Sequence, residues 1–265
     1  MKIVYNFTVR LIKLRETHCS TPTRQLGADM CKEMKTKVLQ LLPPTSNGPS
    51  VDRETNRTEV LETTVKALKE GHVVAVPTDT IYGLACLAQN SEAIRRTYEI
   101  KGRNEHKPLA ICVGEVQDIY EYCQVKVKKE LLSDLLPGPV TLVFERSELL
   151  NSDLNSFTQL VGVRIPNHHF MRRLCQMCRE PLALTSANIS SHSSTVEVNE
   201  FQELWPKLAV VVDGGPIGDE NRLGSTVVDL SVLGKYRIIR PGCALSATVD
   251  VLERKYGLSE DSGTD

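Results

Sequence analysis

Short runs of Val, Leu and Ile alternate with amphipathic stretches along most of this chain, and this alternation constrains its fold more than any other feature. Short continuous apolar runs are typical of strands buried on both faces, whereas apolar residues spaced three or four apart are typical of helices that cover a sheet. Some predicted strands lie too close together in sequence for a crossover helix. The pattern therefore predicts an α/β domain built on a mixed sheet.

The expected elements follow one another from about residue 58. A helix with Leu61, Val65 and Leu68 on one face should end at Gly71, because glycine readily takes the left-handed conformation beyond a helix. Strands are predicted at 72–76, 109–113, 140–145, 160–165, 182–186, 208–212, 225–230 and 236–240. Further helices are predicted at 91–100, 116–123, 128–135, 168–178, 198–204 and 248–256.

Four polar segments each follow or lie close to a predicted strand, at 77–80, 101–103, 185–188 and 240–242. They can meet on the loops at one rim of the sheet, where open α/β folds bind ligands. Lys101 and Arg103 flank a glycine, so both cations can converge on one anion while the backbone approaches closely. This arrangement suits a phosphate-bearing ligand, and a nucleotide is the obvious candidate.

The usual glycine-rich phosphate motifs are missing from the sequence. There is no Gly-x-x-x-x-Gly-Lys-Ser/Thr, and no Gly-x-Gly-x-x-Gly follows a strand. Ser186 lacks the Gly-x-Ser-x-Gly context of a hydrolase nucleophile. Phosphates would therefore have to be bound by side-chain cations and loop amides.

The Lys101-x-Arg103 pair followed much later by Ser186-x-Asn188 resembles the signature of the YrdC family of threonylcarbamoyl-AMP synthases. Further segments are similar to family segments and come in the same order, at 77–84, 136–142, 162–166, 224–229 and 239–242. An ordered set of this kind is more specific than any single tripeptide. The resemblance implies a single YrdC-like α/β domain over about residues 58–257, with a twisted mixed sheet, flanking helices and a concave basic cleft.

The chemistry that the resemblance implies starts from L-threonine, bicarbonate and ATP. An N-carboxylated threonine attacks the α-phosphate of ATP and gives threonylcarbamoyl-AMP and pyrophosphate. This nucleophile is already an anion, so the reaction needs no strong base and depends on cations and hydrogen-bond donors. Mg²⁺ is expected to arrive with ATP and pyrophosphate, because no acidic cluster in the sequence suggests a dedicated protein site for a metal.

The resemblance also implies roles for individual positions. The expected catalytic residues are Lys101 and Arg103, and the expected nucleotide contacts are Arg103, Lys107, Ser186, Asn188, Ser194 and Arg240. The expected threonine contacts are Thr80, Arg164, Ser225 and Thr226. Cys112 stands where some relatives have a histidine, which leaves its role open.

Simpler interpretations of single residues stay open at this point. Thr80 could cap a turn, and Asn188 could be a left-handed turn residue. Arg164 alternates with apolar neighbours and could lie on the solvated face of an edge strand. The eight cysteines, including the pair Cys175 and Cys178, are typical of buried reduced thiols rather than of a metal site or disulfide framework.

The main alternative function is an RNA-binding module with a YrdC-like fold. The sequence argues mildly against it, because the net charge is -1 and aromatic residues make up only 5% of the chain. A carbamoyl-transfer domain like that of hydrogenase-maturation factors is a third interpretation, but those factors carry additional modules for which this chain has no room.

The two ends of the chain differ from the middle in composition. Residues 1–57 are expected to hold a basic segment that resembles a mitochondrial presequence, or else a basic tail, followed by a proline-rich linker. Residues 258–265 are expected to be a disordered tail. The expected locations are the cytoplasm and mitochondria, with no membrane span. The expected partners are a KEOPS-type or mitochondrial threonylcarbamoyl transferase that takes the product, together with weak RNA binding.

Overall fold

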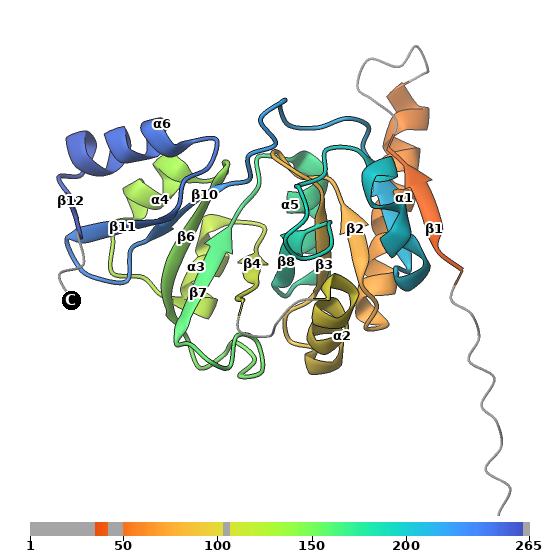
Figure 1. Ribbon diagram of the computed structural model, residues 1–265, viewed down its shortest axis with the longest axis horizontal. Coiled ribbons are helices and arrows are strands. Elements are labelled where there is room, and N and C mark those ends of the chain that lie inside the picture. The colour runs from red at the N-terminus through yellow and green to blue at the C-terminus, as the bar shows by residue number, and fades with distance from the viewer. Residues whose placement is uncertain (1–34, 42–49, 103–106, 262–265) are drawn as a thin grey trace, which may run out of the picture. The chain divides into compact units, whose positions relative to one another are not determined.

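The computed structural model describes residues 35–41, 50–102 and 107–261 (Figure 1). The strands of this part of the chain are β1 (Lys37–Gln40), β2 (Val74–Val76), β3 (Gly83–Leu87), β4 (Ala110–Cys112), β5 (Cys123–Gln124), β6 (Val140–Arg146), β7 (Leu160–Arg164), β8 (Leu182–Ser186), β9 (Val210–Asp213), β10 (Thr226–Asp229), β11 (Lys235–Arg240) and β12 (Ser259–Glu260). The helices are α1 (Ser50–Lys69), α2 (Ser91–Lys101), α3 (Val116–Tyr122), α4 (Lys129–Leu135), α5 (His169–Cys178), α6 (Leu245–Asp250), the 3-10 helix η1 (Val198–Lys207) and the π-helical turn η2 (Val251–Lys255).

The described strands form one twisted sheet in the order β1-β9-β2-β3-β8-β4-β7-β6-β10-β11-β12, with β5 beside β6 (Figure 1). Neighbours are parallel in some pairs, such as β4 with β7 and β6 with β10, and antiparallel in others, such as β3 with β8 and β6 with β7. The prediction of a mixed sheet with flanking helices is therefore confirmed.

Two hydrophobic cores lie on opposite faces of the sheet, because successive side chains of a strand point to opposite sides. One core packs α2, α3, α4 and η1 against strands along most of the sheet, including β6, β7 and β10. The other packs α1 and α5 against β9, β2, β3, β8 and the end of β4 only. On this second face the helices leave β6, β7 and β10 uncovered.

The sheet extends beyond the predicted boundaries of the domain. β1 pairs in parallel with β9, and α1 begins at Ser50, so folded structure starts before residue 58. β12 pairs with β11, so residues 259–260 belong to the sheet and not to a tail. Both added strands are short and almost wholly exposed, and for this reason they carry no alternating apolar pattern. The predicted basic segment at 1–25 and most of the predicted linker lie outside the described residues.

Most predicted elements are present, and the clearest omission is β3. It follows β2 after only six residues, pairs with it in antiparallel fashion, and reads Gly-Leu-Ala-Cys-Leu without a β-branched residue. The predicted elements include no strand over residues 83–87. Among the described helices, none is long and apolar enough to cross a membrane.

Candidate active site

A pocket of about 580 Å³ lies on the sheet face that α1 and α5 leave uncovered. The alternating residues of β6 show why it forms there: Val140, Leu142 and Phe144 enter the core, whereas Thr141 and Val143 line the pocket. Gly162 of β7 keeps the floor low, because a Cβ atom at this position would lie 2.9 Å from the Thr141 methyl carbon. The floor of the pocket is thus the open side of the sheet itself.

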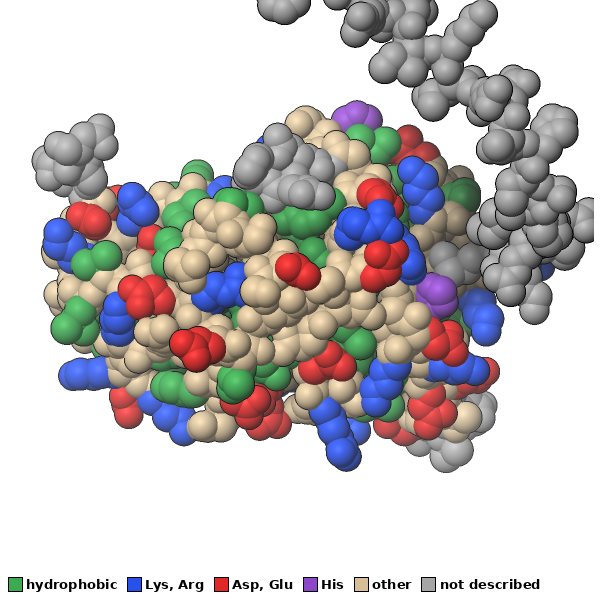
Figure 2. All heavy atoms as spheres, turned by 90° about the horizontal axis from the view of Figure 1, so that it is seen from below, with side chains coloured by type: hydrophobic (Ala, Val, Ile, Leu, Met, Phe, Trp, Pro, Cys, Tyr) green, Lys and Arg blue, Asp and Glu red, His purple; other side chains and the backbone are tan. Residues whose placement is uncertain are grey.

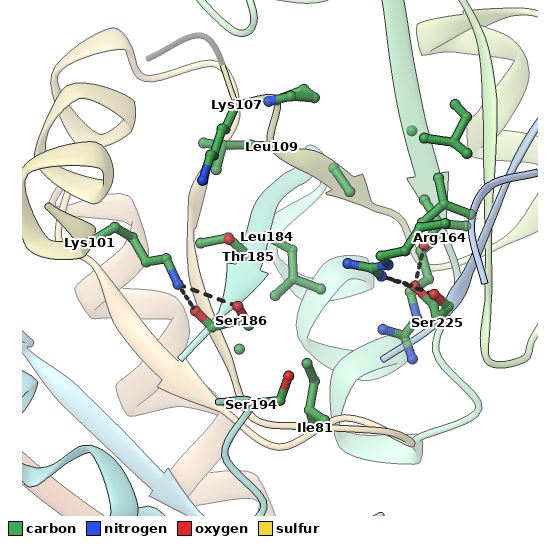
Figure 3. A pocket seen from close by; sticks show the side chains of 18 of the residues that line it. Ile81, Lys101, Lys107, Leu109, Arg164, Leu184, Thr185, Ser186, Ser194 and Ser225 are labelled. Atoms are coloured by element: carbon green, nitrogen blue, oxygen red, sulfur yellow. Dashed lines mark hydrogen bonds between the residues drawn. The ribbon is translucent and has the colours of Figure 1, made fainter. Parts of the chain in front are cut away.

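Lys101 is the last residue of α2, and its side chain is only 2% exposed. Its ammonium nitrogen lies 2.6 Å from the carbonyl oxygen of Ser186, 3.3 Å from the Ser186 hydroxyl and 3.1 Å from Asn188 Oδ1, and it also donates to the Asn188 carbonyl. These oxygens belong to the loop that leaves β8. Lys101 therefore lines the pocket and at the same time holds together the two predicted Ser-x-Asn residues (Figure 3).

The Asn188 side chain continues this network into the next loop. Its amide nitrogen donates to the carbonyl oxygens of Ile189 at 2.8 Å and His192 at 2.7 Å. Asn188 is absent from the residues with positive φ, so it is not the left-handed turn residue that one interpretation allowed. Ser194 follows in the same loop and also lines the pocket.

Arg164 ends β7 at the opposite side of the pocket, and it is 5% exposed in an interior strand between β4 and β6. The solvated edge-strand interpretation is therefore excluded. Its guanidinium donates to the Asp79 carboxylate and, at 2.9 Å, to the Thr80 hydroxyl. Thr80 is buried behind Arg164 and does not line the pocket. The turn after β2 is capped by Thr78, whose hydroxyl accepts from the Thr80 amide at 3.1 Å.

Asp79 was not predicted as a site residue. Its second carboxylate oxygen accepts a hydrogen bond from the Asn167 backbone amide at 2.9 Å, so both oxygens are engaged. The only signal for Asp79 in the sequence was that it lies in the family-like segment 77–84. The structure shows what Asp79 does there: its carboxylate orients the Arg164 guanidinium.

Arg240, at the end of β11, completes this side of the pocket. Its guanidinium donates to the carbonyl oxygen of Ser225 at 2.9 Å, and the Ser225 hydroxyl lies 2.8 Å from that of Thr141. Ser225 lines the pocket, whereas its neighbour Thr226 is fully buried and accepts a hydrogen bond from the Ala244 amide. Of this predicted pair, Ser225 is the residue that a ligand can reach.

The predicted residues are thus brought to two ends of one pocket. Figure 3 shows Lys101, Lys107 and Ser186 on one side and Arg164 and Ser225 on the other. Arg103 lies outside the described residues. Among the described residues that line the pocket, none is Asp or Glu. Two cationic ends separated by a neutral floor can hold a ligand with two anionic groups, or two anionic ligands side by side.

The outer surface differs from the pocket. On the face shown in Figure 2, Lys and Arg side chains are interspersed with Asp and Glu side chains, and no large patch carries a single sign of charge. A dedicated nucleic-acid binder concentrates Lys and Arg on one face. The face in view does not have that character.

None of the described cysteines lines the pocket: Cys86, Cys112, Cys123, Cys175 and Cys178 are buried, whereas Cys243 is exposed. Cys112 is fully buried, on the same side of the sheet as Cys175 and Cys178 of α5, and burial raises the pKa of the Cys178 thiol to about 12. Within residues 35–41, 50–102 and 107–261, no group of three or more His, Cys, Asp or Glu side chains could hold a metal ion.

An α/β domain with this pocket has the geometry and charge to bind anionic small molecules, and comparisons identify the family. Residues 66–242 match the Sua5/YciO/YrdC family, whose description reads "Telomere recombination". The chain belongs to this family.

Individual relatives are similar over most of their length. The chain is 63% identical to the threonylcarbamoyl-AMP synthase of Mus musculus over 211 residues, which cover 78% of this chain and 75% of the relative. It is also 63% identical to the threonylcarbamoyl-AMP synthase of Homo sapiens over 205 residues, covering 76% and 74% of the two chains.

A solved structure gives the same fold. Sua5 of Pyrococcus abyssi complexed with L-threonine aligns with a TM-score of 0.70 at 25% identity, over 85% of this chain and 62% of Sua5. This chain therefore spans less than two thirds of the Sua5 chain.

Proposed function

We propose that this protein is an L-threonylcarbamoyl-AMP synthase, which converts L-threonine, bicarbonate and ATP into threonylcarbamoyl-AMP and pyrophosphate. The observation that carries the proposal is the 63% identity, over about three quarters of their length, to mammalian proteins with that name. The pocket agrees with it, because its two cationic ends suit an amino-acid carboxylate and a polyphosphate.

The threonine end is assigned to Arg164. Its guanidinium is held by Asp79 and Thr80, and it can present its planar edge to a carboxylate. Ser225 lies on the same side and can bind the rest of the amino acid. The complex of the related Sua5 with L-threonine supports the choice of ligand.

The nucleotide end is assigned to the side with Lys101, Lys107, Ser186, Asn188 and Ser194. Arg240 lies on the side of Ser225 and is assigned to the phosphates that extend toward it. Threonine and bicarbonate first lose water and form an N-carboxylated threonine. One oxygen of that carboxylate then attacks the α-phosphorus of ATP, the bond from the α-phosphorus to its bridging oxygen breaks, and pyrophosphate leaves. Fixed cations and loop donors stabilise the charge on the phosphorus, which is the largest contribution that a preorganised site can make.

ATP is the nucleotide substrate, and Mg²⁺ is expected to accompany its phosphates. The described lining residues include no carboxylate, so the ion would be held by phosphate oxygens and water, as is common for Mg²⁺ at nucleotide sites. The protein residues that face this group are then the cations and hydroxyls named above.

The product is proposed to pass to a KEOPS-type transferase, or to its mitochondrial counterpart, which modifies tRNA. The protein is proposed to work in both the cytoplasm and mitochondria, because residues 1–25 are basic and poor in acidic residues, as presequences are. Weak RNA binding belongs to the same proposal. Imaging of a protein fused at its carboxyl end, with and without residues 1–34, tests the location, and a matrix pool that survives this deletion would contradict it.

The proposed reaction is tested by the fate of labelled bicarbonate. Incubation with ¹³C-bicarbonate, L-threonine and ATP should give an adenylate whose mass carries both the label and the threonine. A protein that yields no labelled adenylate but binds RNA tightly would support the alternative of an RNA-binding module. That alternative is not favoured, since the relatives are named as synthases.

A further inference from the structure

Asn155 lies in the loop between β6 and β7, outside all family-like segments of the sequence, and it is 2% exposed. Its side chain makes a two-point contact with a single residue of another loop. The amide oxygen accepts from the Leu109 backbone N–H at 2.8 Å, and the amide nitrogen donates to the Leu109 carbonyl at 2.9 Å. This side chain pairs with Leu109 as a neighbouring strand would.

Leu109 belongs to a segment that forms one wall of the pocket. Lys107, Pro108, Leu109 and Ala110 all line it, and this segment leads into β4. A second contact holds the same segment, because the Tyr98 hydroxyl of α2 lies 3.1 Å from the Lys107 carbonyl oxygen. The same hydroxyl lies 3.4 Å from Asn155 Oδ1.

The other side of Asn155 also leads to the pocket. Its backbone carbonyl accepts a hydrogen bond from the Thr158 amide at 3.0 Å, which closes a turn that contains Phe157. Phe157 and Thr158 line the pocket, and Phe157 is 41% exposed. Asn155 has a φ of 54°, in the left-handed region that asparagine tolerates better than most residues.

We propose that Asn155 is a positioning residue for the nucleotide end of the pocket: it ties the Lys107 segment to the turn that carries Phe157 and Thr158. The inference rests on the proposed function. The Asn155 side chain contacts the backbone of Leu109, and the Asn155 backbone carbonyl closes the turn with Thr158. Asn155 therefore acts through the Lys107 segment and this turn, and does not touch the substrate. The Asn155 amide satisfies one buried N–H and one buried C=O of Leu109. Replacement of its oxygen or its nitrogen would leave one of these backbone groups buried without a hydrogen bond, which costs the desolvation free energy of that group.

The threonine end gives an internal control. Arg164, Asp79 and Ser225 are held by hydrogen bonds in which neither Asn155 nor Leu109 takes part. Loss of the Asn155 contact should therefore weaken ATP binding while threonine binding changes little. A purely structural role would change both Michaelis constants together or neither.

The experiment measures KM for ATP, KM for threonine and kcat by pyrophosphate release for wild type, Asn155→Asp and Asn151→Asp. Asn155→Asp keeps the shape but replaces the donor to the Leu109 carbonyl by an oxygen. Asn151 is in the same loop, yet its side chain contacts Ala88, Ser91 and Asp153 instead of the pocket. ATP-induced and threonine-induced shifts of the melting temperature give a second reading that does not depend on turnover.

For Asn155→Asp we expect KM for ATP to rise about tenfold or more, with KM for threonine within about twofold and kcat within about threefold of wild type. Asn151→Asp should match wild type. Equal changes in both Michaelis constants, or none, would overturn the proposal. If Asn155→Asp does not fold, Asn155→Gly replaces it, because glycine tolerates the φ of 54° and removes both contacts with Leu109. An unchanged KM for ATP in that variant would also overturn the proposal. A wild-type protein without threonine-dependent pyrophosphate release would instead refute the synthase assignment.

Discussion

Arg164 forms an ion pair with Asp79 in which the two side chains are only 6% and 10% exposed. The Arg164 Nε atom is buried and has no hydrogen-bond partner among the described residues. Asp79 and Thr80 both accept from the same guanidinium nitrogen, Nη2, so the group is held in place and keeps further donors for an incoming carboxylate. This relationship supports the proposed assignment of the amino-acid end of the substrate to Arg164.

Asp79→Asn should weaken threonine binding more than ATP binding. The neutral amide leaves Arg164 without its buried counter-charge, so we expect KM for threonine to rise about tenfold in steady-state assays. Asp229→Asn is a matched control, because Asp229 is also buried and paired with an arginine, but its partner Arg237 does not line the pocket as Arg164 does. An unchanged KM for threonine in a folded Asp79→Asn protein would move the threonine site elsewhere.

Lys101→Met should lower both turnover and stability. Turnover should fall by about two orders of magnitude, the usual effect of removing one preorganised donor at a reacting phosphate. Stability should fall by about 1–3 kcal/mol, because Ser186 and Asn188 lose the donor for their carbonyl oxygens. Urea unfolding measures the second effect, and wild-type stability would contradict the network described for Lys101.

Arg103→Ala tests the other half of the Lys-x-Arg pair. From the family resemblance we expect the same loss of turnover, about two orders of magnitude, with folding intact. Arg237→Ala, an exposed arginine of β11, provides the surface control. Near-normal turnover of a well-folded Arg103→Ala protein would show that the phosphates bind elsewhere.

Gly242→Ala should destabilise the wall that carries Ser225. A Cβ atom at Gly242 would lie 2.3 Å from the Thr226 backbone nitrogen and 2.4 Å from the Ser225 carbonyl carbon, so the backbone would have to move. Gly257→Ala is the comparison: its φ is +65°, but a Cβ there meets no atom within 4 Å, so only the strain of the left-handed conformation applies. Thermal melts should show a larger loss for Gly242→Ala, and equal losses would contradict the close contact.

Two truncations of the amino terminus should differ in their effect on stability, because only the longer one removes β1. Removal of residues 1–34 should leave synthase activity unchanged, because β1 begins at Lys37 and no family-like segment lies in that range. Removal of residues 1–50 also deletes β1 and uncovers the edge of β9, so the melting temperature should fall. Identical melting curves for the two truncated proteins would show that β1 adds nothing to the sheet.

The central strands could be predicted because their apolar pattern is set by burial on the sheet. The same reasoning missed β1 and β12, which are exposed edge strands, and β3, whose small residues lack strand preference. The pattern of residues thus predicted most interior strands and missed both edge strands and the interior strand β3.

The site was predicted in part for a different reason. The resemblance identified Lys101, Ser186, Asn188 and Arg164, but it could not show that Lys101 is buried against backbone carbonyls. Asp79 and Asn155 were missed because their partners, Arg164 and Leu109, are 85 and 46 residues away in the chain. Contacts between residues so far apart in the chain depend on the order of the strands in the sheet. The spacing of apolar and polar residues within one segment does not reveal that order.

The most direct test of the central claim is pyrophosphate release from ATP, measured with the complete mixture and then with threonine or bicarbonate left out. The account predicts rapid release in the complete mixture and release near the background of protein-free samples when either one is absent. Release that continues unchanged without threonine or without bicarbonate would contradict the assignment of this pocket to threonylcarbamoyl-AMP synthesis.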